Sequence, residues 1–313
     1  MSRTSLPTVR SARIGLLQIS LAGALWGTGG LAVQLIRDIM PMSVLTISAY
    51  RMLIAAIVLV VVVLVVGRGG PLRALVKERP VHAVAVGCGT AAYQAFYFGA
   101  VVTAGVTVAT AIALGLAPVL LSISDAARER RLIPLPKVMV LIAALAGLVL
   151  VSGFADIAGT AAPQSGLGIL LAMASGTTYA VTTVLGRTLA QRADPLVLTT
   201  ATTTTGALVL LSIGVLAGPT GPILTTDPAA LGWLIYLGVF TMAMAYGLLY
   251  AGLRTTPGST AVIASLLEPV TAAVSAALFL SERLPPTGIA GTILILTAVA
   301  GISARPRAPR GQP

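Results

Sequence analysis

Residues 92–105 read AYQAFYFGAVVTAG, and residues 245–258 read AYGLLYAGLRTTPG. Besides their first alanines, five positions match at a spacing of 153 residues: Tyr93, Tyr97, Gly99, Thr103 and Gly105 pair with Tyr246, Tyr250, Gly252, Thr256 and Gly258. Helices rich in Ala, Gly and Val can resemble one another through composition, but composition does not explain matched tyrosines in a chain that has only 7 of them. Pro118-Val119 matches Pro269-Val270 at a spacing of 151. The sequence therefore predicts two copies of one structural unit.

The composition places this unit in a membrane. Of the 313 residues, 57% are hydrophobic and 9% are charged, whereas soluble domains are about 25% charged. The mean hydropathy is +0.98. Because so few polar side chains cannot cover a soluble surface, the composition excludes soluble enzymes, disordered proteins and nucleic-acid-binding proteins.

Ten apolar runs have the length of a membrane span, which takes about 17 to 25 residues. Strand alternation is absent from them, so they favour helices over a β-barrel. The runs are residues 14–36, 42–66, 81–101, 106–124, 138–154, 165–189, 196–217, 229–253, 259–280 and 288–302. We therefore expect an all-α integral membrane protein.

The repeat divides these runs into five and five, with a first unit at 1–154 and a second at 155–313 that ends in a short basic tail. An odd number of spans forces the second unit to enter the membrane upside down. Inverted repeats of this kind are used by carriers that expose a midplane site to the two sides alternately. The prediction is ten transmembrane helices arranged as two inverted five-helix repeats around a central cavity.

The positive charges predict the orientation. Of the 20 Lys and Arg residues, 17 fall on the side of the N-terminus, and only Arg37 and Arg283 fall on the other, with Arg51 inside a run. Cytoplasmic loops carry the excess of positive charge, so both termini are expected in the cytoplasm of a cell inner (plasma) membrane. The net charge of +11 then reflects topology and not a nucleic-acid partner. The first run lacks a cleavage site and is expected to be retained.

Several kinds of chemistry are not expected. A lone cysteine, Cys88, allows no intramolecular disulfide, and no Walker motif for ATP occurs. Hydrolases need metal ligands, a Ser–His pair or paired aspartates, but the one histidine, His82, lies at the end of a run. We expect no enzyme activity, no cofactor and no metal. A channel is the alternative to a carrier. Channels are usually marked by rings of charged residues or a filter of carbonyl groups, and the sequence shows neither.

A family resemblance covers residues 14–303. It rests on Leu25-Trp26-Gly27, Arg51 with Ala55, the two Tyr-x-x-x-Tyr-x-Gly motifs, and Leu267-Glu268-Pro269-Val270 running to Ser281-Glu282-Arg283-Leu284. In this order the motifs resemble the EamA-type ten-helix members of the drug/metabolite transporter superfamily. The resemblance implies an inner-membrane exporter of amino acids or related metabolites, similar to YddG-type exporters, with a cavity between its halves. Ala117 stands where the second half has Glu268.

Two charged residues lie inside the runs. Glu268 is about ten residues into the ninth, where an ionised carboxylate costs about 2.5 to 3.5 kcal/mol. It either binds a substrate ammonium group or a proton in the cavity, or is a protonated or helix-capped carboxyl beside Pro269. Arg51 can fix a substrate carboxylate, pair with Glu268 or bond to freed carbonyls. Because the second span of EamA-like proteins resembles a peripheral scaffold helix, a structural role is favoured for Arg51.

Aromatic residues make up only 4% of the chain, yet several fall at corresponding places of the two halves. Trp26 aligns with Tyr179 at the spacing of 153. Hydroxyl groups at membrane depth need partners or water, which favours a cavity, although hydrogen bonding between helices is the alternative. The predicted substrate-binding residues are Trp26, Tyr93, Gln94, Tyr97, Tyr179, Tyr246, Tyr250 and Glu268, with Arg51 as a structural or charge-pair candidate.

The expected partners are a small-molecule substrate and the lipid bilayer, with no nucleic acid, and the protein is expected to be a monomer or a weak homodimer. The predicted function is export of neutral or aromatic amino acids, and a broader range of related metabolites, by alternating access. Proton coupling and simple uniport both remain open. The alternative is a carrier of another small metabolite, such as a nucleotide sugar or a drug-like cation.

Overall fold

A computed structural model describes residues 9–152, 165–217, 221–279 and 285–303 of the chain. In that part all regular structure is helical, and helices account for each of the ten predicted runs. The first half contains α1 (Val9–Ile39), α2 (Val44–Val65), α3 (Gly69–Glu78), α4 (Pro80–Ala104), α5 (Val106–Glu129) and α6 (Leu135–Val151). The second contains α8 (Ser165–Ala190), α9 (Pro195–Ala217), α10 (Pro228–Tyr236), η1 (Leu237–Met244), α11 (Ala245–Leu253), α12 (Gly258–Ala264), α13 (Leu267–Phe279) and α14 (Pro286–Ser303).

Eight of the helical segments are long and apolar enough to cross a membrane, and α6 and α14 are shorter apolar helices. The eighth and ninth segments are not simple helices. The eighth runs through α10, the π-helical turns of η1 and α11, and the ninth is interrupted between α12 and α13. The predicted all-α fold with ten membrane segments is confirmed, while the predicted boundary between residues 154 and 155 lies outside the described residues.

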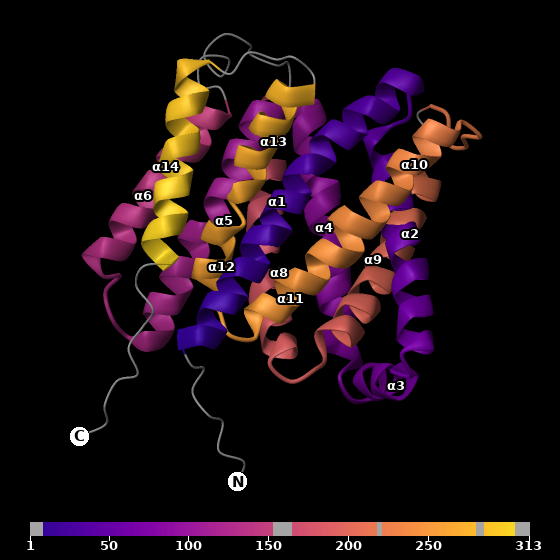
Figure 1. Cartoon of the computed structure of the whole chain (residues 1–313), viewed down its shortest axis with the longest axis horizontal. Coiled ribbons are helices and arrows are strands. Elements are labelled where there is room, and N and C mark those ends of the chain that lie inside the picture. The colour runs from indigo at the N-terminus through magenta and orange to yellow at the C-terminus, as the bar shows by residue number, and fades with distance from the viewer. Residues whose placement is uncertain (1–8, 153–164, 218–220, 280–284, 304–313) are drawn as a thin grey trace.

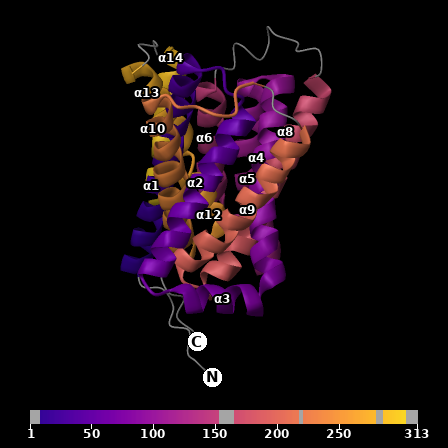
Figure 2. The ribbon, with the colours of Figure 1, turned by 90° about the vertical axis from the view of Figure 1, so that its right-hand side faces the viewer.

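The two halves run in opposite directions (Figure 1). The start of α1 and the end of α14 lie at the same end of the bundle, whereas α6 finishes and α8 begins at the other end. The side view in Figure 2 agrees with this arrangement. Five membrane segments in each half therefore produce the inversion that the odd number of spans predicts.

The packing between helices has a matching two-fold pattern. In sequence order, α4 and α11 belong to corresponding segments of the two halves, as do α8 and α1. The contact of α4 with α8 is repeated by α11 with α1, and that of α5 with α8 is repeated by α13 with α1. Two further contacts, α2 with α9 and α6 with α14, join corresponding helices to each other. Each half thus packs mainly on the other, and the centre of the molecule is an interface between repeats.

Short polar segments set the ends of the helices. The Ser43 hydroxyl accepts a hydrogen bond from the Thr46 amide at 3.1 Å and caps α2, as side-chain oxygens do at helix N-termini. Asp227 caps α10 by accepting from the Ala229 and Ala230 amides, both at 2.9 Å. Gly105, a residue of the repeated motif, has φ of 85° and forms the one-residue turn between α4 and α5. Glycine adopts this left-handed backbone at no steric cost.

The helix α3 is the one element that the apolar runs do not predict. It is 10 residues long and carries Arg73, Lys77 and Glu78, so it is too short and too polar to span a bilayer. It lies across one end of the bundle (Figure 2). Leu75 is buried against the main core and anchors it there.

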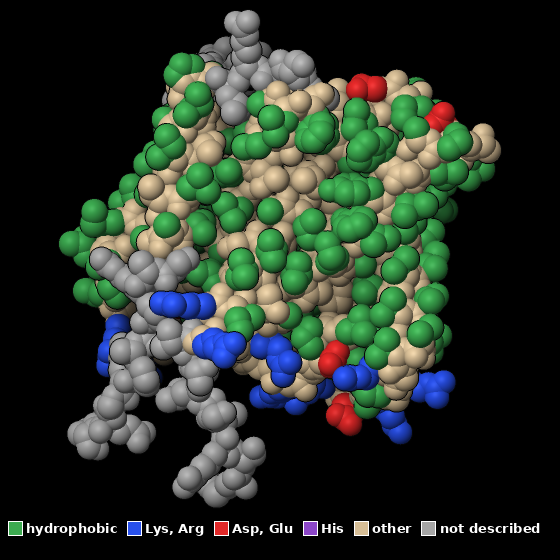
Figure 3. All heavy atoms as spheres, in the orientation of Figure 1, with side chains coloured by type: hydrophobic (Ala, Val, Ile, Leu, Met, Phe, Trp, Pro, Cys, Tyr) green, Lys and Arg blue, Asp and Glu red, His purple; other side chains and the backbone are tan. Residues whose placement is uncertain are grey.

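The surface separates charge from apolar side chains (Figure 3). Lys and Arg gather at the end of the bundle where α1 begins, while hydrophobic side chains cover the middle. The exposed apolar residues include Leu17, Val65, Leu208 and Leu278 on four different helices. A band of this kind suits contact with lipid, and the chain is a multi-span membrane protein.

Candidate functional site

A cavity lies at the centre of the bundle, at the interface between the two halves. It offers about 50 Å³ to the centres of water molecules. Each half contributes three helices to it, α1, α2 and α4 from the first and α8, α11 and α13 from the second. Its lining residues are Trp26, Arg51, Tyr93, Tyr179, Tyr246 and Glu268.

The aromatic side chains of this central cavity form two equivalent pairs. The ring centroids of Tyr93 and Tyr179 are 5.2 Å apart, with 30° between the ring planes. Those of Trp26 and Tyr246 are also 5.2 Å apart, in an edge-to-face arrangement with 63° between the planes. The spacing of 153 residues that relates Tyr93 to Tyr246 also relates Trp26 to Tyr179. The inverted repeat therefore builds a two-fold aromatic frame across the interface.

The charged and amide groups do not follow this symmetry. Gln94 corresponds to Gly247 at the spacing of 153, and Glu268 corresponds to Ala117 at the spacing of 151. The frame is therefore symmetric, whereas the groups that could recognise a polar substrate are arranged in one orientation only. Such an asymmetric set of charges can orient a bound molecule relative to the membrane.

Glu268 is positioned by the interruption of the ninth segment. Pro269 has no amide N–H, so the carbonyl of Ser265 has no helical donor four residues later. The amide of Glu268 donates to that carbonyl instead, at 2.9 Å. Discontinuous helices near the membrane centre are typical of transporter binding sites. The interruption brings the Glu268 carboxyl to the wall of the central cavity.

Glycines in α1 permit the close approach of this segment. A side-chain carbon at Gly23 would lie 2.8 Å from the Ser265 carbonyl oxygen, and one at Gly27 would clash with the Glu268 carbonyl oxygen. The space beside Gly23 and Gly27 is thus filled by backbone atoms of the ninth membrane segment, an approach that small residues in membrane helices allow. Gly27 fixes the distance between α1 and the residue that carries the carboxylate.

Arg51 extends from α2 to the same cavity. Its Nη2 donates to Oε1 of Gln94 at 2.7 Å, while its Nε is buried and has no hydrogen-bond partner in the described part of the chain. Gln94 is only 2% exposed, and its Nε2 donates to the Met52 sulfur at 3.6 Å and to the Thr90 carbonyl at 3.4 Å. Over residues 9–152, 165–217, 221–279 and 285–303, no ion pair joins Arg51 to Glu268.

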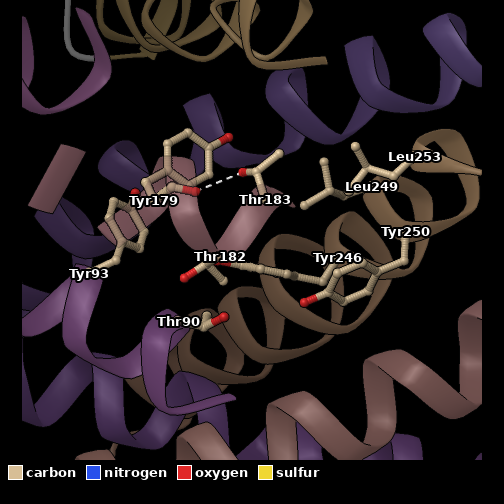
Figure 4. Close-up of a pocket in the computed structure, with 9 residues that line it drawn as sticks. All are labelled: Thr90, Tyr93, Tyr179, Thr182, Thr183, Tyr246, Leu249, Tyr250 and Leu253. Atoms are coloured by element: carbon tan, nitrogen blue, oxygen red, sulfur yellow. Dashed lines mark hydrogen bonds between the residues drawn. The ribbon is translucent and has the colours of Figure 1, made fainter. Parts of the chain in front are cut away.

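A second cavity shares part of its lining with the first, and Figure 4 shows the residues around it. It is smaller, with about 10 Å³ open to the centres of water molecules. It shares Tyr93, Tyr179 and Tyr246 with the central cavity and extends along α11 to Leu249, Tyr250 and Leu253. Thr183 lies on its wall and donates to the Tyr179 carbonyl at 2.8 Å. The three shared tyrosines thus form the boundary between the two cavities.

The structure brings most of the predicted site residues together. Trp26, Tyr93, Tyr179, Tyr246 and Glu268 line the central cavity, along with Arg51. The remaining three predicted residues lie elsewhere. Gln94 sits behind Arg51, and Tyr250 lines the second cavity.

Tyr97 lines neither of these two cavities. Its hydroxyl is hydrogen-bonded to Thr110 at 2.8 Å, and its ring contacts Phe98. Tyr93 and Tyr97 are one helical turn apart. The ring of Tyr93 stacks on Tyr179 of α8, whereas the hydroxyl of Tyr97 bonds to α5 and its ring packs on a cluster that includes Ala172 of α8.

Another cluster of polar residues joins the two halves at the Lys/Arg-rich end of the bundle. The Ser259 hydroxyl of α12 donates to the Asp125 carboxylate of α5, and Lys137 of α6 donates to Ser259 at 2.9 Å. Lys137 also lies 3.6 Å from Asp125. On the same side, the Nε of Arg187 donates to the Thr256 carbonyl at 3.0 Å. Sequence reasoning missed this cluster, because Asp125 immediately follows an apolar run and its partners are more than a hundred residues away or across a turn.

Comparisons with known proteins agree with this geometry. Residues 13–153 and 166–304 each match the model of the EamA-like transporter family. A Bacillus subtilis (strain 168) protein named "Uncharacterized transporter YwfM" is 29% identical over 297 residues, which cover 93% of this chain and 94% of that protein. An Archaeoglobus fulgidus protein named "Uncharacterized transporter" is 27% identical over 291 residues, covering 90% and 95% of the two chains. One solved crystal structure shares the fold, with a TM-score of 0.76 and 23% identity over 92% of this chain and 95% of its own.

Proposed function

Because the chain belongs to the EamA-like transporter family of the drug/metabolite transporter superfamily, we propose that it exports amino acids across the cell inner membrane. The observation that carries this proposal is the central cavity, where one carboxylate and four aromatic rings meet at the interface of two inverted repeats. Inverted-repeat carriers bind substrate at such an interface. The direction of transport follows the resemblance to exporters of this family.

The lining of the cavity fits an ammonium group with an organic side chain. The Glu268 carboxylate can accept hydrogen bonds from an ammonium group, and the faces of Trp26 and Tyr246 attract a cation in a desolvated site. The paired rings of Tyr93 and Tyr179 offer apolar surface to the side chain of the substrate. Neutral and aromatic amino acids combine these features.

The size of the cavity supports a mechanism with moving halves. A space of about 50 Å³ holds a few water molecules, whereas sites for small ligands measure about 300 to 1,000 Å³. Substrate access therefore requires the halves to separate on one side. In the proposed cycle the Lys/Arg-rich side faces the cytoplasm, the substrate enters from there, and rigid-body rocking of the halves opens the site outward.

Two other substrate classes fit the cavity less well. A nucleotide sugar carries two phosphate charges and would need several cations, yet among the described residues Arg51 is the one cation that lines the cavity. A drug-like cation would satisfy Glu268 and the rings but would leave Arg51 without an anion. Amino acids with a free carboxylate satisfy both charged residues.

Efflux from proteoliposomes tests the proposal. Purified protein is reconstituted with labelled threonine, methionine or phenylalanine inside, with and without a pH gradient. We expect saturable efflux of at least one of the three amino acids by the wild type and by Tyr97→Phe, which keeps its ring outside the cavities, and loss of efflux in Glu268→Gln. Stimulation by the gradient indicates proton antiport, and indifference to it indicates uniport. If the wild type exports none of the three, or if Glu268→Gln matches its rate for every substrate, the proposal fails.

A further inference from the structure

The Arg51 guanidinium group makes no direct contact with a carboxylate in the described part of the chain. A guanidinium group has five N–H donors and keeps its proton at all ordinary pH values. In the described part of the chain, Nη2 bonds to a neutral amide, Nε is buried without a partner, and no carboxylate pairs with the group. Buried charges in membrane helices are costly and are almost always paired. An arginine that acts only as a structural lock would be expected to use its donors within the protein.

The surroundings hold Arg51 in place without cancelling its charge. Gln94 fixes Nη2 at 2.7 Å, and Gln94 is itself held by Met52 and by the Thr90 carbonyl. An amide can orient a guanidinium group and still leave its positive charge available to a ligand. The fixed fork of donors suits a planar carboxylate.

The second charge of the cavity is placed to complement the first. Among the described residues, Glu268 is the one acidic side chain that lines the central cavity, and it attracts Arg51 electrostatically without touching it. A cavity that presents a guanidinium group and a carboxylate, which are not in direct contact with each other, matches a molecule that carries both charges. The inversion does not duplicate Gln94, which holds Arg51, or Glu268, because Gly247 and Ala117 occupy the equivalent positions. A ligand can therefore bind in one orientation only.

We infer that Arg51 binds the carboxylate of the substrate while Glu268 binds its ammonium group, so that the site selects α-amino-acid zwitterions over molecules with one charge. Gln94 is a positioning residue, which acts through Arg51. The inference rests on the proposed function and adds a second point of recognition to it. It also replaces the structural role that the sequence favoured for Arg51.

The test compares ligands that differ by one charged group. Binding of phenylalanine, phenethylamine, which lacks the carboxylate, and hydrocinnamate, which lacks the ammonium group, is measured on purified protein by titration calorimetry. A lost charge-assisted contact weakens binding roughly 10- to 100-fold, so we expect phenylalanine to bind the wild type more tightly than either analogue by about this factor. Arg51→Gln is expected to bind phenylalanine no better than phenethylamine.

A second variant tests the same inference in case Arg51→Gln does not fold. In Gln94→Glu the new side chain has nearly the same shape as the glutamine and still accepts the hydrogen bond from Arg51 Nη2. Its carboxylate, however, pairs with Arg51 in place of the carboxylate of the substrate. We expect it to weaken phenylalanine roughly 10-fold or more and to leave phenethylamine as tight as in the wild type or tighter.

Three outcomes would overturn the inference. If phenethylamine binds the wild type as tightly as phenylalanine does, the carboxylate is not recognised, although amino-acid transport itself can stand. If Gln94→Glu or Arg51→Gln weakens both ligands equally, Arg51 is structural. If the wild type binds phenylalanine, threonine and methionine no better than the singly charged analogues and exports none of them, the inference falls together with the proposed function.

Discussion

Tyr93 of α4 stacks on Tyr179 of α8, with 5.2 Å between the ring centroids, and so links the first half of the protein to the second. The pair recurs as Tyr246 with Trp26 at the same separation. Because an inverted repeat places equivalent residues on opposite halves, each pair crosses the interface that opens in the proposed transport cycle. In the proposed function the aromatic frame is thus both the substrate-binding surface and a contact between the parts that move.

The frame predicts that the ring of Tyr179, and not its hydroxyl, carries most of the affinity for an aromatic substrate. Tyr179→Ala should raise the KM for phenylalanine roughly 10-fold, because a stacked ring and its apolar surface are lost. Tyr179→Phe should stay within about 3-fold of the wild type, because the hydroxyl contributes a single 3.3 Å contact with Ser265. Initial rates of efflux at increasing phenylalanine concentration measure both. Equal effects of the two substitutions would assign the role to the hydroxyl.

Glu268 predicts a dependence of transport on pH. The carboxylate binds an ammonium group only when it is ionised, so acidification on both sides should slow the export of phenylalanine. The charged and titratable groups that line the cavity with Glu268 are Arg51, Tyr93, Tyr179 and Tyr246, none of which changes charge below neutral pH. The ordinary pKa of a glutamate is about 4.3, so efflux is measured at equal internal and external pH from pH 8 to pH 4. Glu268→Asp should keep the profile at a lower rate, and an unchanged wild-type rate at pH 4 would contradict the role given to Glu268.

The close approach of α1 and α13 predicts a strong effect of one added methyl group. At Gly27 a side-chain carbon would meet the Glu268 carbonyl, the Thr271 side chain and the Ala272 amide, whereas at Gly30 it would meet nothing within 4 Å. Gly27→Ala should therefore lower the stability by about 1–3 kcal/mol, while Gly30→Ala in the same helix should leave it unchanged or slightly raised. Thermal unfolding in detergent compares the two. Equal unfolding temperatures would show that α13 does not lie against α1.

The cluster of Asp125, Ser259 and Lys137 predicts a closed Lys/Arg-rich side. These residues come from both halves, so their hydrogen bonds must break when that side opens. Ser259→Ala should favour opening and speed the alkylation of a cysteine placed at Thr183, in a background with Cys88→Ala. Ser212→Ala is the control, because its hydroxyl bonds only to Leu208 in its own helix. Equal alkylation rates in the two variants would remove the cluster from the opening step.

The sequence predicted the fold better than it predicted details of the site. Hydrophobic length gave the ten membrane segments, and the spacing of 153 between Tyr93 and Tyr246 gave the inversion. The same spacing placed Trp26 and Tyr179 at corresponding positions, and the structure brings both to the central cavity. These features depend on local composition and on repetition, which a sequence displays directly.

Other features depend on which helix each residue meets. Tyr97 has the same spacing as its counterpart Tyr250, but it turns to Thr110 because α5 lies next to that turn of α4. The hydrogen bond between Arg51 and Gln94 joins residues 43 positions apart, so no local sequence pattern predicts it. The amphipathic helix α3 lacks the apolar length that identifies a span.

Counterflow in proteoliposomes is the most direct measurement of whether this protein is a carrier with a site between inverted halves. Vesicles loaded with unlabelled phenylalanine are diluted into a trace of labelled phenylalanine, and the internal label is followed over time. A carrier that alternates its site should accumulate label transiently above the equilibrium value in the wild type, and Glu268→Gln should show no such overshoot. Label that rises only to equilibrium in the wild type, at a rate that does not saturate with concentration, would indicate a pore and contradict alternating access.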